Sequence, residues 1–130
     1  MGILNVVERL DYNYSSRVSN LLPTVPKLLS FYFHGIFKDD KDLQSNLMHP
    51  QQKFTVENFR MFFEYFLSKG YNFISPEDLE KEEGLTKKNI LMTFDDGNFS
   101  NHLILPLLNE YKIPAIFFIP TTYTKTQKSF

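Results

Sequence analysis

The chain has 130 residues, of which 42% are hydrophobic and 22% are charged, and its formal net charge is -1. A chain of this length forms one domain at most and can bury a core of its own. The near-neutral charge argues against the concentrated basic face that binds nucleic acid electrostatically. The sequence contains no cysteine, which excludes disulfides, thiolate metal sites and a cysteine nucleophile.

The N-terminal residues do not show a basic stretch followed by an apolar one, which is the pattern of a signal peptide. No run approaches the roughly 18 apolar residues that a membrane-spanning helix needs. We therefore expect a cytoplasmic protein without a membrane span.

Residues 1–27 mix apolar, polar and charged residues without a clear helix or strand period. We interpret them as a lead-in segment. The aromatic run from Leu28 to His34 is typical of a buried strand that ends near Gly35. Within it we expect Tyr32 in the core. Residues 38–53 are polar and predict a long loop.

A helix is predicted to begin after Thr55, which is a good N-cap residue, and to end before Gly70. Its core face is an apolar stripe at helical spacing, formed by Phe59, Phe62, Phe63 and Phe66. Residues 71–74 then predict a short strand. A second short helix follows from Ser75, with a proline in its first turn.

The last part of the chain contains two more apolar runs, which predict buried strands over residues 89–94 and 114–119. Residues 100–111 between them carry leucines on one face and predict a helix. Pro106 should either kink that helix or restrict it to its first turns. Residues 120–130 are polar and show no helix pattern.

Strands therefore alternate with helices, which indicates an α/β fold with parallel strands. In such folds, sites form at the carboxyl ends of the strands. One predicted strand ends with His34, and another ends with Asp95 and Asp96 followed by Gly97. These positions are the candidates for chemistry.

Two adjacent carboxylates point to opposite sides of a strand unless the backbone is distorted, and Gly97 would allow a sharp turn there. A nearby cation would offset their repulsion. One carboxylate could then bind a metal ion while the other accepts a proton from a metal-bound water. The alternative is that Asp96 or Asn98 caps the next helix and Asp95 is solvated. Spacing alone leaves both interpretations open.

The run Thr93-Phe94-Asp95-Asp96-Gly97 resembles the signature of NodB-homology polysaccharide deacetylases, the carbohydrate esterase family 4-like group that removes N- or O-acetyl groups from sugar polymers. The flanking residues 105–119 are similar to the helix and strand that follow this signature, and the resemblance extends over residues 28–122. It implies that residues 28–130 are the N-terminal part of a NodB-type distorted (β/α) barrel with parallel strands.

The resemblance implies that Asp95 is the catalytic general base and that Asp96 is a ligand of a divalent metal, with zinc as the metal that the resemblance suggests. It also implies an acetylated carbohydrate as substrate. His34 is a candidate site-lining residue, and the alternative is a histidine satisfied within the core. The family's further ligands come from a His-(Ser/Thr)-x-x-His motif, which this sequence lacks. We therefore expect a chain that is truncated before that motif and is inactive in isolation.

The two other histidines are expected at the surface: His102 on a helix face and His49 in a polar loop. Two alternatives to a deacetylase fragment remain. The chain could be a non-catalytic remnant that binds a carbohydrate or a partner. It could also be half of a split barrel that another chain completes, in which case it should self-associate or require that partner.

Overall fold

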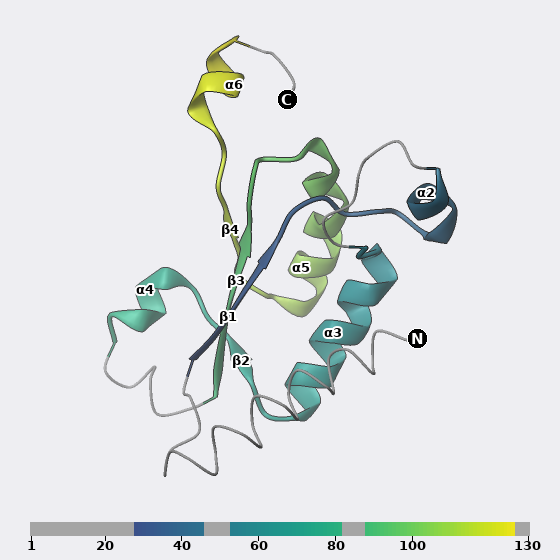
Figure 1. Ribbon diagram of the computed structural model, residues 1–130. Coiled ribbons are helices and arrows are strands. Elements are labelled where there is room, and N and C mark those ends of the chain that lie inside the picture. The colour runs from purple at the N-terminus through teal and green to yellow at the C-terminus, as the bar shows by residue number, and fades with distance from the viewer. Residues whose placement is uncertain (1–27, 46–52, 82–87, 127–130) are drawn as a thin grey trace, which may run out of the picture.

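The computed structural model describes residues 28–45, 53–81 and 88–126, so the predicted lead-in segment lies outside the described residues (Figure 1). The elements in chain order are β1 (Leu28–Phe33), α2 (Asp40–Gln44), α3 (Val56–Ser68), β2 (Asn72–Phe73), α4 (Pro76–Leu79), β3 (Asn89–Phe94), the 3-10 helix η2 (Phe99–Ile104), α5 (Leu105–Tyr111), β4 (Ile116–Phe117) and α6 (Thr121–Thr126).

The sheet is built around β3, and every strand pair in it is parallel. Strand β1 pairs with β3 along its whole length, from Leu28 beside Asn89 to Phe33 beside Phe94. The short strands β2 and β4 pair with the beginning and the end of β3, respectively. The predicted α/β fold with parallel strands is thereby confirmed.

Helices α3 and α5 lie on the same side of the sheet (Figure 1). Helix α3 begins at a capping box in which Thr55 Oγ1 accepts from the Asn58 N–H and Asn58 Oδ1 accepts from the Thr55 N–H. The predicted phenylalanine stripe of this helix is buried, and Phe59 and Phe63 are fully so. Burial of this stripe against the strands holds α3 on the sheet.

The phenylalanines at the ends of three strands form a row beneath these helices. Phe33 lies beside Phe94, and Phe94 lies beside Phe117. The ring centroids are 5.6 Å apart in the first pair and 4.8 Å apart in the second, which is stacked. This row anchors the carboxyl edge of the sheet to the core.

A polar contact fastens α3 to α5 at the rim of the core. The Arg60 guanidinium donates to both carboxylate oxygens of Glu110, at 2.7 and 3.1 Å, and to the Tyr111 hydroxyl at 3.3 Å. These hydrogen bonds raise the pKa of Arg60, and the same pair lowers the pKa of the Glu110 carboxyl. A bidentate pair of this kind adds a geometrically specific contact between the two helices.

Two predictions of irregular structure are wrong. Residues Asp40–Gln44 of the predicted loop form α2, because Asp39 Oδ1 accepts from the N–H groups of Lys41 and Asp42 and caps one helical turn. The predicted irregular tail contains α6 (Thr121–Thr126). Threonine has a low intrinsic helix propensity, so neither composition nor periodicity indicated this helix.

Two elements predicted in the last part of the chain have different bounds in the structure. The single helix predicted over residues 100–111 is a 3-10 helix followed by α5, and Pro106 lies in the first turn of α5, where its missing N–H costs no helical hydrogen bond. Only Ile116 and Phe117 of the strand predicted over residues 114–119 join the ladder. Among the described helices, none is long and apolar enough to cross a membrane.

Candidate functional site

The site begins one residue beyond the ends of three strands. The ladder continues there, because the Asp95 N–H donates to the Phe33 carbonyl and the Phe118 N–H donates to the Phe94 carbonyl, both at 2.8 Å. The phenylalanine row is therefore followed by a second row, formed by His34, Asp95 and Phe118.

Alternation along a strand places the two rows on opposite faces of the sheet. Phe94 is fully buried under the helices, as predicted, so Asp95 belongs to the other face. Tyr32 belongs to this face too, with its ring centroid 5.9 Å from that of His34. The prediction that Tyr32 is a core residue is wrong: it is 61% exposed, because α3 packs on its neighbour Phe31 instead.

The backbone turns sharply at Asp96, which has φ 68°, and at Gly97, which has φ 56°. A positive φ is uncommon for a residue other than glycine, although aspartate tolerates it better than most. The distortion that two adjacent carboxylates require thus begins at Asp96 itself, whereas the sequence pointed only to Gly97. Residues in such sparsely populated conformations cluster at functional sites.

The turn brings Asp96 to His34. Their closest atoms, Asp96 Oδ2 and His34 Nε2, are 3.8 Å apart, which is ion-pairing distance when the imidazole is protonated. The His34 side chain is 18% exposed, and its Nδ1 is buried without a hydrogen-bond partner among the described residues. The predicted site-lining histidine therefore lies next to the aspartate that was predicted to bind the metal.

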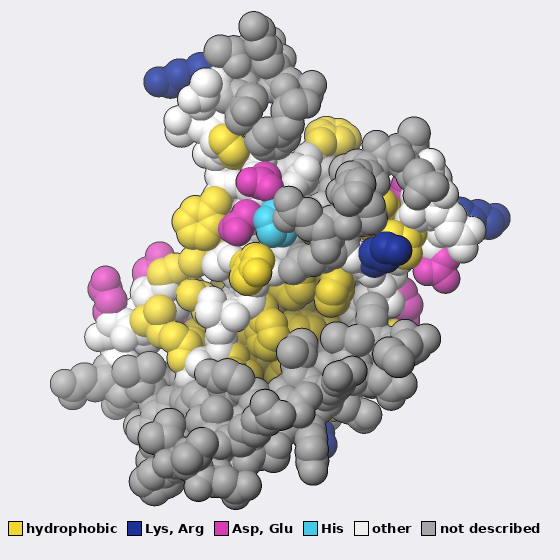
Figure 2. Space-filling view, in the orientation of Figure 1, with side chains coloured by type: hydrophobic (Ala, Val, Ile, Leu, Met, Phe, Trp, Pro, Cys, Tyr) yellow, Lys and Arg dark blue, Asp and Glu magenta, His cyan; other side chains and the backbone are white. Residues whose placement is uncertain are grey.

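Gly97 packs directly against the segment that follows β4. A Cβ atom at Gly97 would lie 3.2 Å from Pro120 Cδ and 3.4 Å from the Cα of Ile119. A pocket of about 520 Å³ opens beside this contact and is lined by Asp95, Asp96, Phe118, Ile119 and Pro120. Figure 2 shows acidic side chains and a histidine gathered together, next to a hydrophobic area.

The remaining candidates stand apart from this pocket. His102 is exposed and its Nδ1 lies 2.7 Å from the Phe99 carbonyl oxygen, as expected for a surface histidine. His49 lies outside the described residues. Asn98 precedes η2, but its side chain makes no capping hydrogen bond, so the capping alternative gains no support from Asn98.

A metal ion fits this site only in part. Catalytic zinc is commonly bound by three protein side chains. Asp96 and His34 have oxygen and nitrogen donor atoms of the kind that bind zinc. The His34 Nδ1 atom has no hydrogen-bond partner among the described residues. In residues 28–45, 53–81 and 88–126, however, no group of three or more histidine, aspartate or glutamate side chains is placed to hold a metal.

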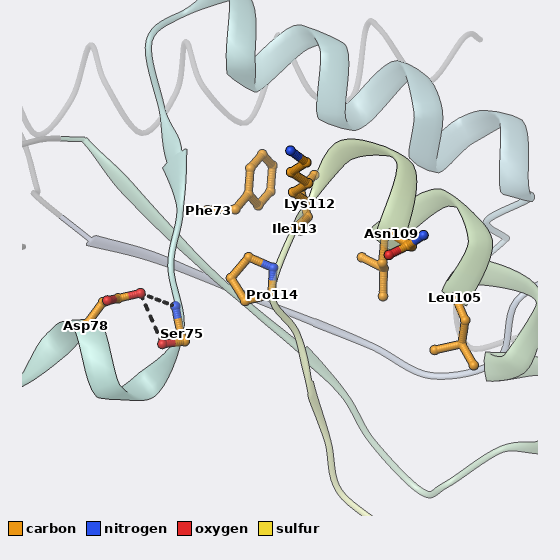
Figure 3. A pocket seen from close by; sticks show the side chains of 9 residues that line it. Phe73, Ser75, Asp78, Leu105, Asn109, Lys112, Ile113 and Pro114 are labelled. Carbon is orange, nitrogen blue, oxygen red and sulfur yellow. Dashed lines mark hydrogen bonds between the residues drawn. The ribbon is translucent and has the colours of Figure 1, made fainter.

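A second pocket, of about 680 Å³, lies between β2 and the segment before β4 (Figure 3). Its wall is largely apolar and includes Phe73, Leu108 and Pro114. Its one carboxylate, Asp78, accepts from the Ser75 N–H and hydroxyl and pairs with Lys81 at 2.9 Å. That carboxylate is engaged in capping α4, so we assign this pocket no chemistry.

The fold and the site define an α/β protein with an aspartate pair at the carboxyl edge of a parallel sheet. A family model described as polysaccharide deacetylase matches residues 82–129, which include β3, the Asp95–Gly97 turn and β4. The predicted resemblance to this family is thereby confirmed over the matched residues. For residues 28–81 it stays a prediction. Neither the curated proteins nor the solved structures contain a significant match to the chain.

Proposed function

We propose that the chain carries the aspartate-pair part of a carbohydrate deacetylase site, which removes acetyl groups from the nitrogen or oxygen atoms of a sugar polymer. The observation that carries this proposal is the Asp95-Asp96-Gly97 turn. It lies inside the stretch that matches polysaccharide deacetylases and at the edge of the sheet where α/β enzymes place their chemistry.

In this proposal Asp95 is the general base. It lines the pocket and belongs to the face of the sheet that α3 and α5 leave uncovered. Its carboxylate accepts a proton from the water that attacks the acetyl carbonyl carbon. The bond from that carbon to the sugar nitrogen or oxygen then breaks as the leaving atom takes up a proton, which balances the one that Asp95 accepted. The products are acetate and the free amine or hydroxyl.

Asp96 and His34 would hold a divalent metal, zinc by resemblance. When bound, such an ion polarises the carbonyl and lowers the pKa of a water molecule. Because the described residues provide two ligands of this kind rather than three, we propose that further ligands come from outside them. We also propose that the parallel sheet is part of a (β/α) barrel.

The test is acetate release from N,N′,N″-triacetylchitotriose and from acetylated xylan in the presence of Zn²⁺. It should use the 130-residue chain and, where the coding DNA continues past Phe130, the longer product. Asp95→Asn should slow release by roughly a hundredfold or more, as expected when a general base is lost. Asp40→Asn, an exposed change in α2, is the matched control and should leave the rate unchanged.

Metal affinity separates the two aspartates. Asp96→Asn should weaken Zn²⁺ binding in isothermal titration calorimetry, whereas Asp95→Asn should leave it near that of the unaltered chain. Equal rates for Asp95→Asn and the unaltered protein would refute the assigned base. Failure of every tested form to release acetate would refute the deacetylase activity.

A further inference from the structure

The end of β4 presents large apolar side chains to solvent beside the aspartate pair. Phe118 is 55% exposed and Ile119 is 61% exposed. Single exposed apolar residues are common on protein surfaces and carry no meaning by themselves. Here, however, both line the same pocket as Asp95 and Asp96, so an apolar wall and two carboxylates face one volume.

The position of this wall is tied to that of the carboxylates. The Phe118 N–H donates to the Phe94 carbonyl at 2.8 Å, directly before Asp95 in the chain. Two residues later, Pro120 packs against the Asp96–Gly97 turn so closely that a Cβ at Gly97 would lie 3.2 Å from its ring. The backbone hydrogen bond and this packing contact therefore place the aromatic ring and the carboxylates on the same edge of the sheet.

The chemistry of this pocket matches one face of a sugar ring. A pyranose with equatorial substituents has an apolar C–H face and a polar rim of hydroxyl groups. The face of a phenyl ring is electron-rich and apolar, so it attracts such C–H groups and is shielded from water by them. Asp95 and Asp96 provide acceptors for hydroxyl or amide N–H groups at the rim.

We propose that Phe118 is a stacking platform for the acetylated pyranose. The platform holds the sugar ring by its C–H face and presents the acetyl group to Asp95. This inference rests on the proposed function, because it assigns a substrate-positioning residue to the same site. The inference differs from the proposed function because it requires that Phe118, an apolar side chain that takes no part in the chemistry, contributes to carbohydrate affinity.

The experiment is a titration of the full chain with N,N′,N″-triacetylchitotriose, followed by saturation-transfer NMR. Transfer to the axial ring protons of one sugar face should exceed transfer to the acetyl methyl groups. Phe118→Ala should weaken binding at least about fivefold, which corresponds to the loss of a few tens of Å² of apolar contact. Phe118→Tyr should retain the affinity, because the aromatic face is preserved.

The matched control is Phe99→Ala, which removes a phenylalanine that is 88% exposed and does not line the pocket. This variant should bind the sugar as the unaltered chain does. Equal affinity of Phe118→Ala and the unaltered chain would overturn the platform, and so would transfer dominated by the methyl groups. Sedimentation that changes on Phe118→Ala while sugar affinity stays constant would identify a protein interface instead, which also overturns it.

The failure of this inference is distinguishable from the failure of the proposed function. If the titration shows Phe118-dependent sugar binding while no form of the protein releases acetate, the platform stands and the deacetylase activity falls. If acetate release depends on Asp95 but is insensitive to Phe118→Ala in both KM and kcat, the activity stands and the platform falls.

Discussion

The two faces of the sheet are built from the same strands but differ in what covers them. On one face, Phe33, Phe94 and Phe117 lie in a row under α3 and α5. On the other, the next residues along each strand are His34, Asp95 and Phe118, which are exposed to different degrees. The first row is part of the packed core, and the second row contains the candidate site residues.

The packed phenylalanine row can position the side chains on the opposite face, because both rows belong to the same strands. Each residue of the second row directly follows a residue of the phenylalanine row, and backbone hydrogen bonds join the rows across the strands. Because the core is close-packed, it holds the strand ends in place. Substitutions in the two rows should therefore have separable effects.

The largest expected effect sharpens this separation directly. Phe59→Ala removes a fully buried ring and should lower the free energy of unfolding by about 3–5 kcal/mol. Phe118→Ala, on the open face, should change it by no more than about 0.5 kcal/mol. Urea unfolding followed by circular dichroism measures both, and similar losses would show that the open face is part of the core.

A smaller effect tests the contact between the Asp96–Gly97 turn and the segment after β4. Gly97→Ala forces alanine to φ 56° and places its Cβ against Pro120, which should cost about 2 kcal/mol or more. Gly70→Ala is the matched control: its φ is 76°, and a Cβ there would meet nothing within 4 Å. It should cost only about 1 kcal/mol, the penalty of the left-handed backbone. Equal losses in urea unfolding would mean that the Gly97 contact with Pro120 contributes nothing.

The smallest effect concerns a carboxylate away from both rows. The Lys81 ammonium, and then the N–H and hydroxyl of Ser75, lower the pKa of Asp78 from its usual 3.8 to about 2. Figure 3 shows the contacts of Asp78 with Ser75. A carboxyl with a lowered pKa stabilises the folded state above its unfolded pKa and loses that contribution as the pH falls through the folded value. The contribution should thus be complete above pH 3.8 and absent below about 2.

Asp78→Asn should therefore be less stable than the unaltered chain above pH 3.8, and the difference should shrink as the pH is lowered to about 2. Unfolding midpoints in urea across this range measure it. A stability difference that does not depend on pH would contradict the stabilisation of the Asp78 carboxylate by Lys81 and Ser75. It would indicate that Asp78 caps α4 without a contribution from its charge.

Much of the covered face could be predicted from the sequence. The apolar run at residues 89–94 forms β3 with the predicted bounds, and the stripe beginning at Phe59 is the core face of α3. These predictions succeeded because burial imposes a period on the apolar residues that is visible without a structure. The short helix α2 has no buried residue and therefore no such period, and the six-residue helix α6 is too short to show one. The sequence did not predict either helix.

The open face was predictable in its residues but not in its geometry. The sequence by itself determined the candidates, because Asp95, Asp96 and Gly97 form a recognisable run at the end of a strand and His34 ends another. Only the tertiary structure decided that Asp96 turns through a positive φ toward His34, that Tyr32 faces solvent, and that Phe118 lies beside Asp95. The physical reason is that these relations depend on strand register and on which face the helices cover, and neither is encoded in a local pattern of residues.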